Sequence, residues 1–140
     1  MKVVILAAGR GSRLLPISRY LPKPLVALVE GKNNLKTILD FQIEKLRKFF
    51  SVNNILVVVG YKKEMIMEAH PELTFVYNEL FLSTNTGKSL LKALKIIQSE
   101  DVLWLNGDVF FDEKVISLLL ESSYSCVLVD NKKCGAEEVK

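Results

Sequence analysis

The sequence is poor in the residue types that build metal clusters, disulfide frameworks and membrane spans. Its 140 residues include two cysteines, Cys126 and Cys134, and a single histidine, His70. The cysteines have no metal-ligand spacing, and Cys126 lies in an apolar run where a reduced, buried thiol is expected. His70 precedes Pro71, so we expect a surface residue at a helix end with no catalytic role. No apolar run approaches the roughly 20 residues that span a bilayer.

Excess charge of one sign is also absent. The 19 basic and 16 acidic residues leave a formal net charge of +3. Nucleic-acid binding needs a broad basic stripe or interleaved aromatic residues, and the sequence has neither. The apolar run at residues 2–8 is too short for a signal peptide. We therefore expect a cytoplasmic protein that binds no nucleic acid and has no membrane span, with one domain around one core.

One segment near the N-terminus concentrates glycine and positive charge. Residues 6–24 read LAAGRGSRLLPISRYLPKP and follow a short apolar run at residues 3–6. Small residues let a ligand lie against the backbone, and glycine permits the tight turn that aims N–H groups at an anion. A polyphosphate also requires cations, and the segment supplies Arg10, Arg13, Arg19 and Lys23. The segment is therefore predicted to be a phosphate-binding loop.

Two common phosphate-binding motifs fit this sequence poorly. Gly9 and Gly11 match the first two glycines of the dinucleotide fingerprint G-x-G-x-x-G, but Leu14 stands where its third glycine should be. Prolines within residues 16–24 also prevent the helix that should follow, because proline lacks an N–H and clashes with the preceding turn. Residues 87–89 resemble the end of a P-loop, whose first glycine would fall on Leu82.

Short apolar runs alternate with segments of helical periodicity. Strands are predicted at residues 3–6, 55–59, 73–77, 102–105 and 126–129, and helices at 35–50, 62–70, 88–97 and 115–120. Asn33 or Asn34 is expected to cap the first helix and Asp112 the last. Trp104 and the phenylalanine pairs at 49–50 and 110–111 are expected in the core. The alternation predicts an α/β fold, a Rossmann-like, doubly wound and mostly parallel sheet with helices on both faces.

The carboxyl ends of such strands share one edge of the sheet, where ligands bind. Distinctive residues follow four of the predicted strands, namely Gly9, Gly60 with Tyr61, Asn78, and Gly107 with Asp108. Every polar cluster is therefore predicted to lie at the same edge.

These motifs together resemble those of a known enzyme family. Residues 6–16 and 22–24 resemble the signature of the nucleotidyltransferases that make nucleotide-sugars and nucleotide-diphospho-alcohols. Further matches occur at residues 59–64, 78, 85–90 and 106–108. They look most like the branch that uses CTP with phosphocholine, inositol phosphate or related phosphates. The resemblance implies transfer of a nucleotidyl group, CMP from CTP, to a phosphorylated alcohol or sugar, with release of pyrophosphate.

The chemistry and the resemblance together assign candidate roles. Arg13 suits a bidentate grip on phosphate oxygens, and Lys23 suits a point charge near the α-phosphate. By resemblance, Asp108 is the candidate ligand of Mg²⁺, and base recognition falls to the start of the loop and to residues 85–89. We predict catalytic roles for Arg13, Lys23 and Asp108. The predicted nucleotide-binding residues are Leu6, Ala7, Ala8, Gly9, Gly11, Ser12, Arg13, Lys23, Asn85, Gly87 and Ser89.

Two other functions stay open, a sugar-1-phosphate uridylyl- or thymidylyltransferase and a non-catalytic nucleotide-sensing or assembly domain. Family members are usually longer, and their second half completes the acceptor site and supplies a second metal-binding carboxylate. We therefore expect residues 1–140 to be the nucleotide-binding N-terminal part of a nucleotidyltransferase domain, with little or no turnover alone. An incomplete sheet would expose an edge or an apolar surface, so we expect homodimers or aggregation.

Overall fold

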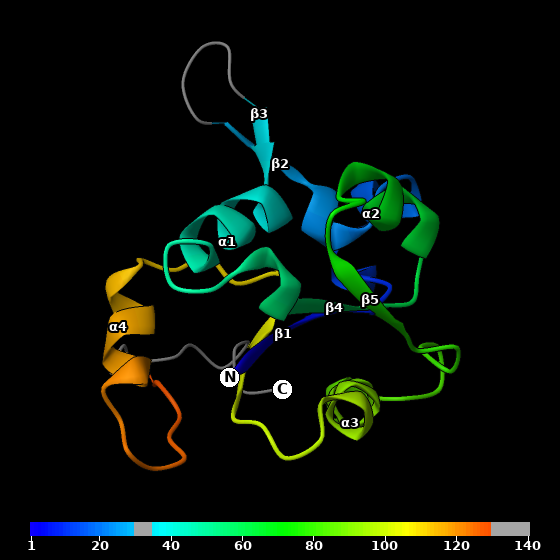
Figure 1. Cartoon of the computed structure of the whole chain (residues 1–140). Helices are drawn as coiled ribbons and strands as arrows, with labels where there is room; N and C mark the ends of the chain where they lie inside the picture. The colour runs from blue at the N-terminus through cyan, green and yellow to red at the C-terminus, as the bar shows by residue number, and fades with distance from the viewer. Residues whose placement is uncertain (30–34, 130–140) are drawn as a thin grey trace. The chain divides into compact units, whose positions relative to one another are not determined.

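The computed structural model describes residues 1–29 and 35–129, so Asn33, Asn34 and Cys134 lie outside the described residues. The chain divides into two compact units, Met1–Phe110 and Phe111–Lys140. The strands are β1 (Lys2–Ala7), β2 (Ala27–Val29), β3 (Leu35–Thr37), β4 (Ile55–Val59), β5 (Thr74–Tyr77) and β6 (Val102–Asn106). The helices are α1 (Ile38–Leu46), α2 (Lys63–Ala69), α3 (Thr86–Ile97) and α4 (Lys114–Leu120) (Figure 1). None of the helices in the described ranges is long and apolar enough to cross a membrane.

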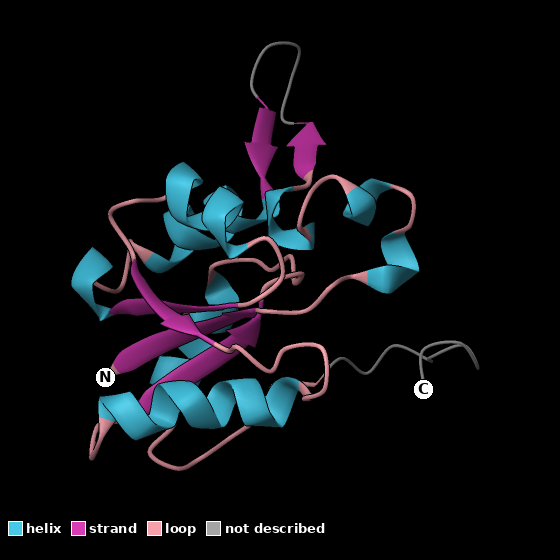
Figure 2. Cartoon of the chain, turned by 90° about the vertical axis from the view of Figure 1, so that its right-hand side faces the viewer, coloured by secondary structure: helices cyan, strands magenta, loops and turns pink. Residues whose placement is uncertain are grey.

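The first unit is built on a parallel sheet with strand order β5-β4-β1-β6. Every residue of β4 is buried, and so are Val3 to Ala7 of β1, because both strands lie inside the sheet under helices on both faces. Helix α3 covers one face, and α1 and α2 cover the other (Figures 1 and 2). This arrangement confirms the predicted doubly wound α/β fold.

Local sequence signals explain where the two longer helices begin. Asn85 caps α3, because its side-chain oxygen accepts the N–H of Lys88 at 3.1 Å. Thr37 caps α1 in a capping box with Asp40, in which each side chain accepts the other residue's backbone N–H. The predicted start of α1 before Leu35 is wrong, because Leu35–Thr37 instead pairs antiparallel with Ala27–Val29.

Four predictions about burial and pairing are also wrong. Residues 126–129 form no strand and are exposed, since no described strand pairs with them, and the thiol of Cys126 is exposed with them. Trp104 is 48% exposed because β6 is an outer strand of the sheet, and Phe49 and Phe110 are also exposed. His70 is buried at the C-terminal end of α2, with its ring nitrogens 3.4 Å from Asp40 and 3.6 Å from Glu72.

The second unit contains α4. Its N-cap position is Glu113, one residue later than predicted. The carboxylate of Asp112 nevertheless accepts the N–H of Lys114 at 2.9 Å, so it satisfies one of the free donors of the first turn.

Candidate active site

The carboxyl ends of the parallel strands surround a pocket of about 360 Å³ within the first unit. Its walls come from the end of β1, the loop that follows it, the segment from Phe81 into α3, and the turn after β6. The lining residues are Leu6, Ala7, Ala8, Gly9, Gly11, Arg13, Lys23, Pro24, Phe81, Thr84, Asn85, Thr86, Ser89, Asn106, Gly107 and Asp108.

Most residues that the sequence nominated for the site line this one pocket. Two nominated residues do not, Ser12 and Gly87. Ser12 is exposed at the start of a 3₁₀ turn, and Gly87 is exposed in the first turn of α3. Sequence reasoning missed Phe81 and Thr84, which lie between β5 and α3 and belong to no motif. The functional roles of the nominated residues stay predictions.

The glycine- and arginine-rich loop is held against the end of β4. Gly11 has a φ of 63°, a left-handed conformation that glycine adopts without strain. The hydroxyl of Tyr61 donates to the carbonyl of Ser18 at 3.0 Å, and the ammonium of Lys62 donates to the carbonyl of Tyr20 at 2.9 Å. The loop thus has anchors outside its own sequence, and it directs Arg13 into the pocket.

Lys23 and Asp108 meet across the pocket as an ion pair. The two residues are 85 positions apart in sequence and are brought together by β1 and β6, which are neighbours in the sheet. Both side chains are partly exposed, Lys23 to 31% and Asp108 to 41%. A cationic and a carboxylate side chain therefore face the same cavity.

The turn that carries Asp108 is fixed from two sides. The N–H of Gly107 donates to the carbonyl of Leu6 at 2.8 Å, and a Cβ at position 107 would lie only 2.9 Å from that oxygen. On the side of α1, the fully buried amide of Gln42 donates to the carbonyls of Asn106 at 3.0 Å and Val109 at 2.7 Å. Helix α1 therefore positions a turn that lies more than 60 residues away in sequence.

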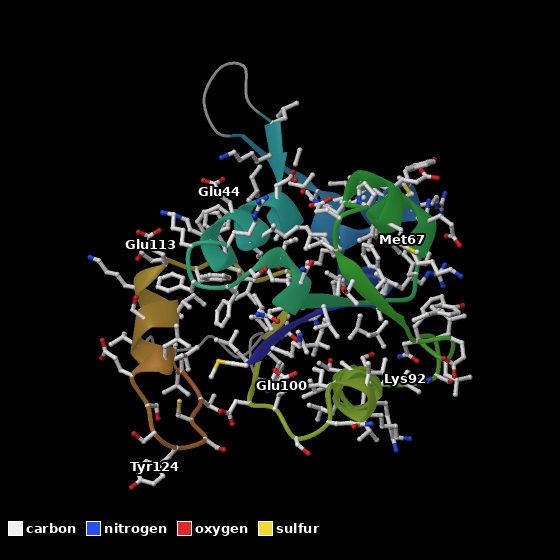
Figure 3. All side chains as sticks on the ribbon, viewed as in Figure 1. Glu44, Met67, Lys92, Glu100, Glu113 and Tyr124 are labelled. Atoms are coloured by element: carbon white, nitrogen blue, oxygen red, sulfur yellow. The ribbon has the colours of Figure 1, made fainter. Side chains whose placement is uncertain are left out.

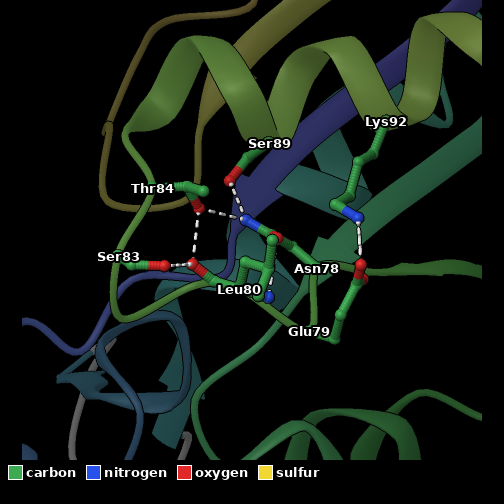
Figure 4. A network of polar contacts seen from close by, with 7 residues as sticks. All are labelled: Asn78, Glu79, Leu80, Ser83, Thr84, Ser89 and Lys92. Atoms are coloured by element: carbon green, nitrogen blue, oxygen red, sulfur yellow. Dashed lines mark hydrogen bonds and ion pairs between the residues drawn. The ribbon is translucent and has the colours of Figure 1, made fainter.

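A buried asparagine organises the opposite wall. Asn78 lies directly after β5 and is fully buried. Its amide nitrogen donates to the hydroxyls of Thr84 and Ser89, each at 2.9 Å (Figure 4). These bonds connect the β5–α3 loop to the first turns of α3, so two pocket-lining hydroxyls are held by one amide.

The residues present suit a magnesium ion that arrives with a phosphate ligand. Among the residues that the structure describes, no group of three or more histidine, cysteine, aspartate or glutamate side chains could hold a metal. Asp108 offers one carboxylate in the pocket. Mg²⁺ is commonly held by one or two carboxylates, with substrate phosphates and water completing its shell. The donor set therefore fits Mg²⁺ bound together with a nucleotide.

Two exposed carboxylates away from the pocket have a lowered pKa. A hydrogen bond from Lys36 lowers the pKa of Glu44, and a hydrogen bond from Lys92 lowers the pKa of Glu79. Glu44 lies on α1 and Lys92 on α3 (Figure 3). Both pairs lie on the surface of the first unit, outside the pocket.

Comparison with known proteins identifies the family. The family model of the MobA-like NTP transferase domain matches residues 3–135 of this sequence. The chain belongs to this family. The predicted relationship to nucleotide-diphospho-sugar transferases is thereby confirmed.

Similar proteins are larger than this chain. The bifunctional protein GlmU of Methanococcus maripaludis is 36% identical over 123 residues, which cover 86% of this chain and 28% of that protein. The D-glycero-alpha-D-manno-heptose 1-phosphate guanylyltransferase of Campylobacter jejuni is 31% identical over 131 residues, with coverages of 91% and 56%. The structure of CTP:phosphocholine cytidylyltransferase from Streptococcus pneumoniae aligns with a TM-score of 0.63 and 29% identity, over 76% of this chain and 44% of that one.

Proposed function

We propose that this chain binds a nucleoside triphosphate, preferably CTP, and carries the nucleotide-binding half of a Mg²⁺-dependent nucleotidyltransferase. The observation that carries the proposal is the convergence of Arg13, Lys23 and Asp108 on one pocket beside the glycine-rich end of β1. In the proposed reaction a phosphate oxygen of the acceptor bonds to the α-phosphorus of the nucleotide. The bond from that phosphorus to the bridging oxygen breaks, and pyrophosphate leaves with the electron pair.

The reacting groups are all anionic, so the protein contributes mainly positioning and charge neutralisation. Arg13 would hold phosphate oxygens through its planar fork. Lys23, now paired with Asp108, would turn its ammonium to the α-phosphate. When bound, Mg²⁺ would neutralise charge on the phosphates, with Asp108 as its protein ligand. The end of β1 and the segment from Asn85 to Ser89 would hold the nucleoside.

The preference for CTP and the nature of the acceptor rest on the similar proteins. The cytidylyltransferase that resembles this chain acts, by its name, on CTP and phosphocholine. The guanylyltransferase that resembles it acts on a heptose 1-phosphate, so a sugar 1-phosphate with another nucleotide is the second candidate. In either case we propose a phosphorylated small molecule as acceptor.

Thermal unfolding with CTP, UTP, dTTP, ATP or GTP, each with Mg²⁺, tests the nucleotide. Only a ligand that binds the native state raises the midpoint, and a concentration of 100 times Kd adds about 2.7 kcal/mol. We expect the largest rise with CTP, and no rise with any nucleotide would refute the proposal.

Release of pyrophosphate tests the reaction. We expect release from CTP in the presence of phosphocholine or a sugar 1-phosphate, and its loss in Asp108→Ala. Tight nucleotide binding without any release would instead favour a nucleotide-sensing domain.

A further inference from the structure

The orientation of the Asn78 amide is fixed by a backbone group. The N–H of Leu80 donates to the side-chain oxygen of Asn78 at 3.2 Å. With the amide flipped, two N–H groups would face each other, so the nitrogen must point to the opposite side. Both amide protons are therefore directed at the hydroxyl oxygens of Thr84 and Ser89.

These bonds determine what each hydroxyl offers to the pocket, because a hydroxyl has one proton and two lone pairs. Thr84 donates its proton to the carbonyl of Leu80 at 2.8 Å and accepts from Asn78, which leaves one lone pair. Ser89 accepts from Asn78 as well, and its own proton has no acceptor in the described part of the chain. Ser89 is only 5% exposed and lines the pocket. Its proton is thus available to a ligand.

We propose that Asn78 is a positioning residue that sets the hydrogen-bond polarity of the base-binding wall, with Ser89 as donor and Thr84 as acceptor. This inference rests on the proposed function, because it takes the pocket to hold a nucleotide. Cytosine suits such a wall, since its ring N3 accepts a hydrogen bond and its neighbouring exocyclic amino group donates one. Asn78 itself contacts no ligand and acts through the two hydroxyls.

Replacing Asn78 by aspartate reverses the polarity of Ser89, and not that of Thr84, with almost no change in shape. The carboxylate still accepts the N–H of Leu80, so the local turn keeps its bond. It has no proton to donate and instead accepts one from Ser89. The serine then presents only a lone pair to the pocket, where it repels an acceptor of the base.

Calorimetric titration with Mg²⁺-CTP and with Mg²⁺-tripolyphosphate tests the inference. Tripolyphosphate has the triphosphate charge but no base, so it reports general effects of the added negative charge. We expect Asn78→Asp to weaken CTP binding by about tenfold more than tripolyphosphate binding, which is the loss of about 1.4 kcal/mol. Asn53→Asp is the matched control, because Asn53 precedes β4 at the opposite edge of the sheet. Asn53→Asp should change neither the affinity for CTP nor the affinity for tripolyphosphate.

Ser89→Ala provides a test that does not depend on a buried charge. It removes the donor and leaves Asn78 in place, so CTP binding should weaken about fivefold while tripolyphosphate binding is unchanged. Equal losses of both ligands in Asn78→Asp, or a full CTP preference in Ser89→Ala, would overturn the inference and leave the proposed function standing. If Asn78→Asp does not fold, Ser89→Ala decides. A wild-type chain that binds no nucleotide refutes both proposals.

Discussion

Replacing Gln42 by methionine should destabilise the turn that carries Asp108 without changing the volume of the core much. The substitution removes the two bonds from the Gln42 amide to the carbonyls of Asn106 and Val109. Each such bond contributes about 1 kcal/mol, and the Asn106 carbonyl keeps a second donor, the N–H of Val109 at 3.3 Å. An opposing gain arises because the Gln42 side-chain oxygen is buried without a partner among the described residues, and methionine removes it. We expect a net loss of about 1 kcal/mol in the free energy of unfolding.

Urea denaturation followed by the fluorescence of Trp104 measures this loss. Gln98→Met is the matched control, because Gln98 is exposed and its side chain makes no hydrogen bond within the described residues. It should change the free energy of unfolding by less than about 0.5 kcal/mol. If the two variants unfold at the same urea concentration, Gln42 does not support the Asp108 turn. If Gln42→Met alone also weakens nucleotide binding, the turn matters for the pocket.

Three further predictions concern the loops around the pocket and a carboxylate on the surface of the first unit. Gly60→Ala should cost about 1–3 kcal/mol, because its Cβ would lie 2.6 Å from the Cβ of Phe81 and 2.7 Å from the carbonyl of Ala8, whereas a Cβ at Gly9 meets nothing within 4 Å. Thermal unfolding of Gly60→Ala and Gly9→Ala compares them, and equal midpoints would contradict the steric argument. Tyr61→Phe removes the bond to the Ser18 carbonyl, so amides of residues 10–21 should exchange hydrogen faster while those of α3 do not change. Uniform exchange across both segments would show that Tyr61 is no anchor. Glu79 has a lowered pKa in the folded chain, so its contribution to stability is present above its ordinary value of 4.5 and is lost as pH falls through the folded pKa. Glu79→Gln should therefore flatten the acid limb of the stability curve, and an unchanged limb would exclude this linkage.

The central strands could be predicted from the sequence because their signal is local. A run such as residues 55–59 is apolar and β-branched throughout, which suits a strand buried on both faces. The phosphate-binding loop after β1 could also be predicted, since its glycines and basic residues lie close together in one segment. The edge of the sheet where they meet followed from topology rules for parallel strands.

The failures share a different cause, which is that they depend on partners distant in sequence. The apolar run at 126–129 has strand composition but finds no described strand to pair with. His70, at the end of α2, lies 3.4 Å from Asp40 of α1, a neighbour 30 positions away in sequence. The role of Gln42 depends on a turn more than 60 positions away, and glutamine inside a helical stripe carries no signal of such a partner.

Loops at a sheet edge have little core of their own, so the precision of a site built from them must come from elsewhere. Here a polar side chain helps to hold each loop, namely Tyr61 after β4, Asn78 after β5 and Gln42 on α1. Each of these residues bonds the backbone or hydroxyls of a loop, and Tyr61 and Gln42 do so without contacting the Lys23–Asp108 pair. Because a small displacement of a phosphate- or base-binding group weakens binding steeply, substitutions at these three positions should alter nucleotide affinity without removing any atom that touches the nucleotide.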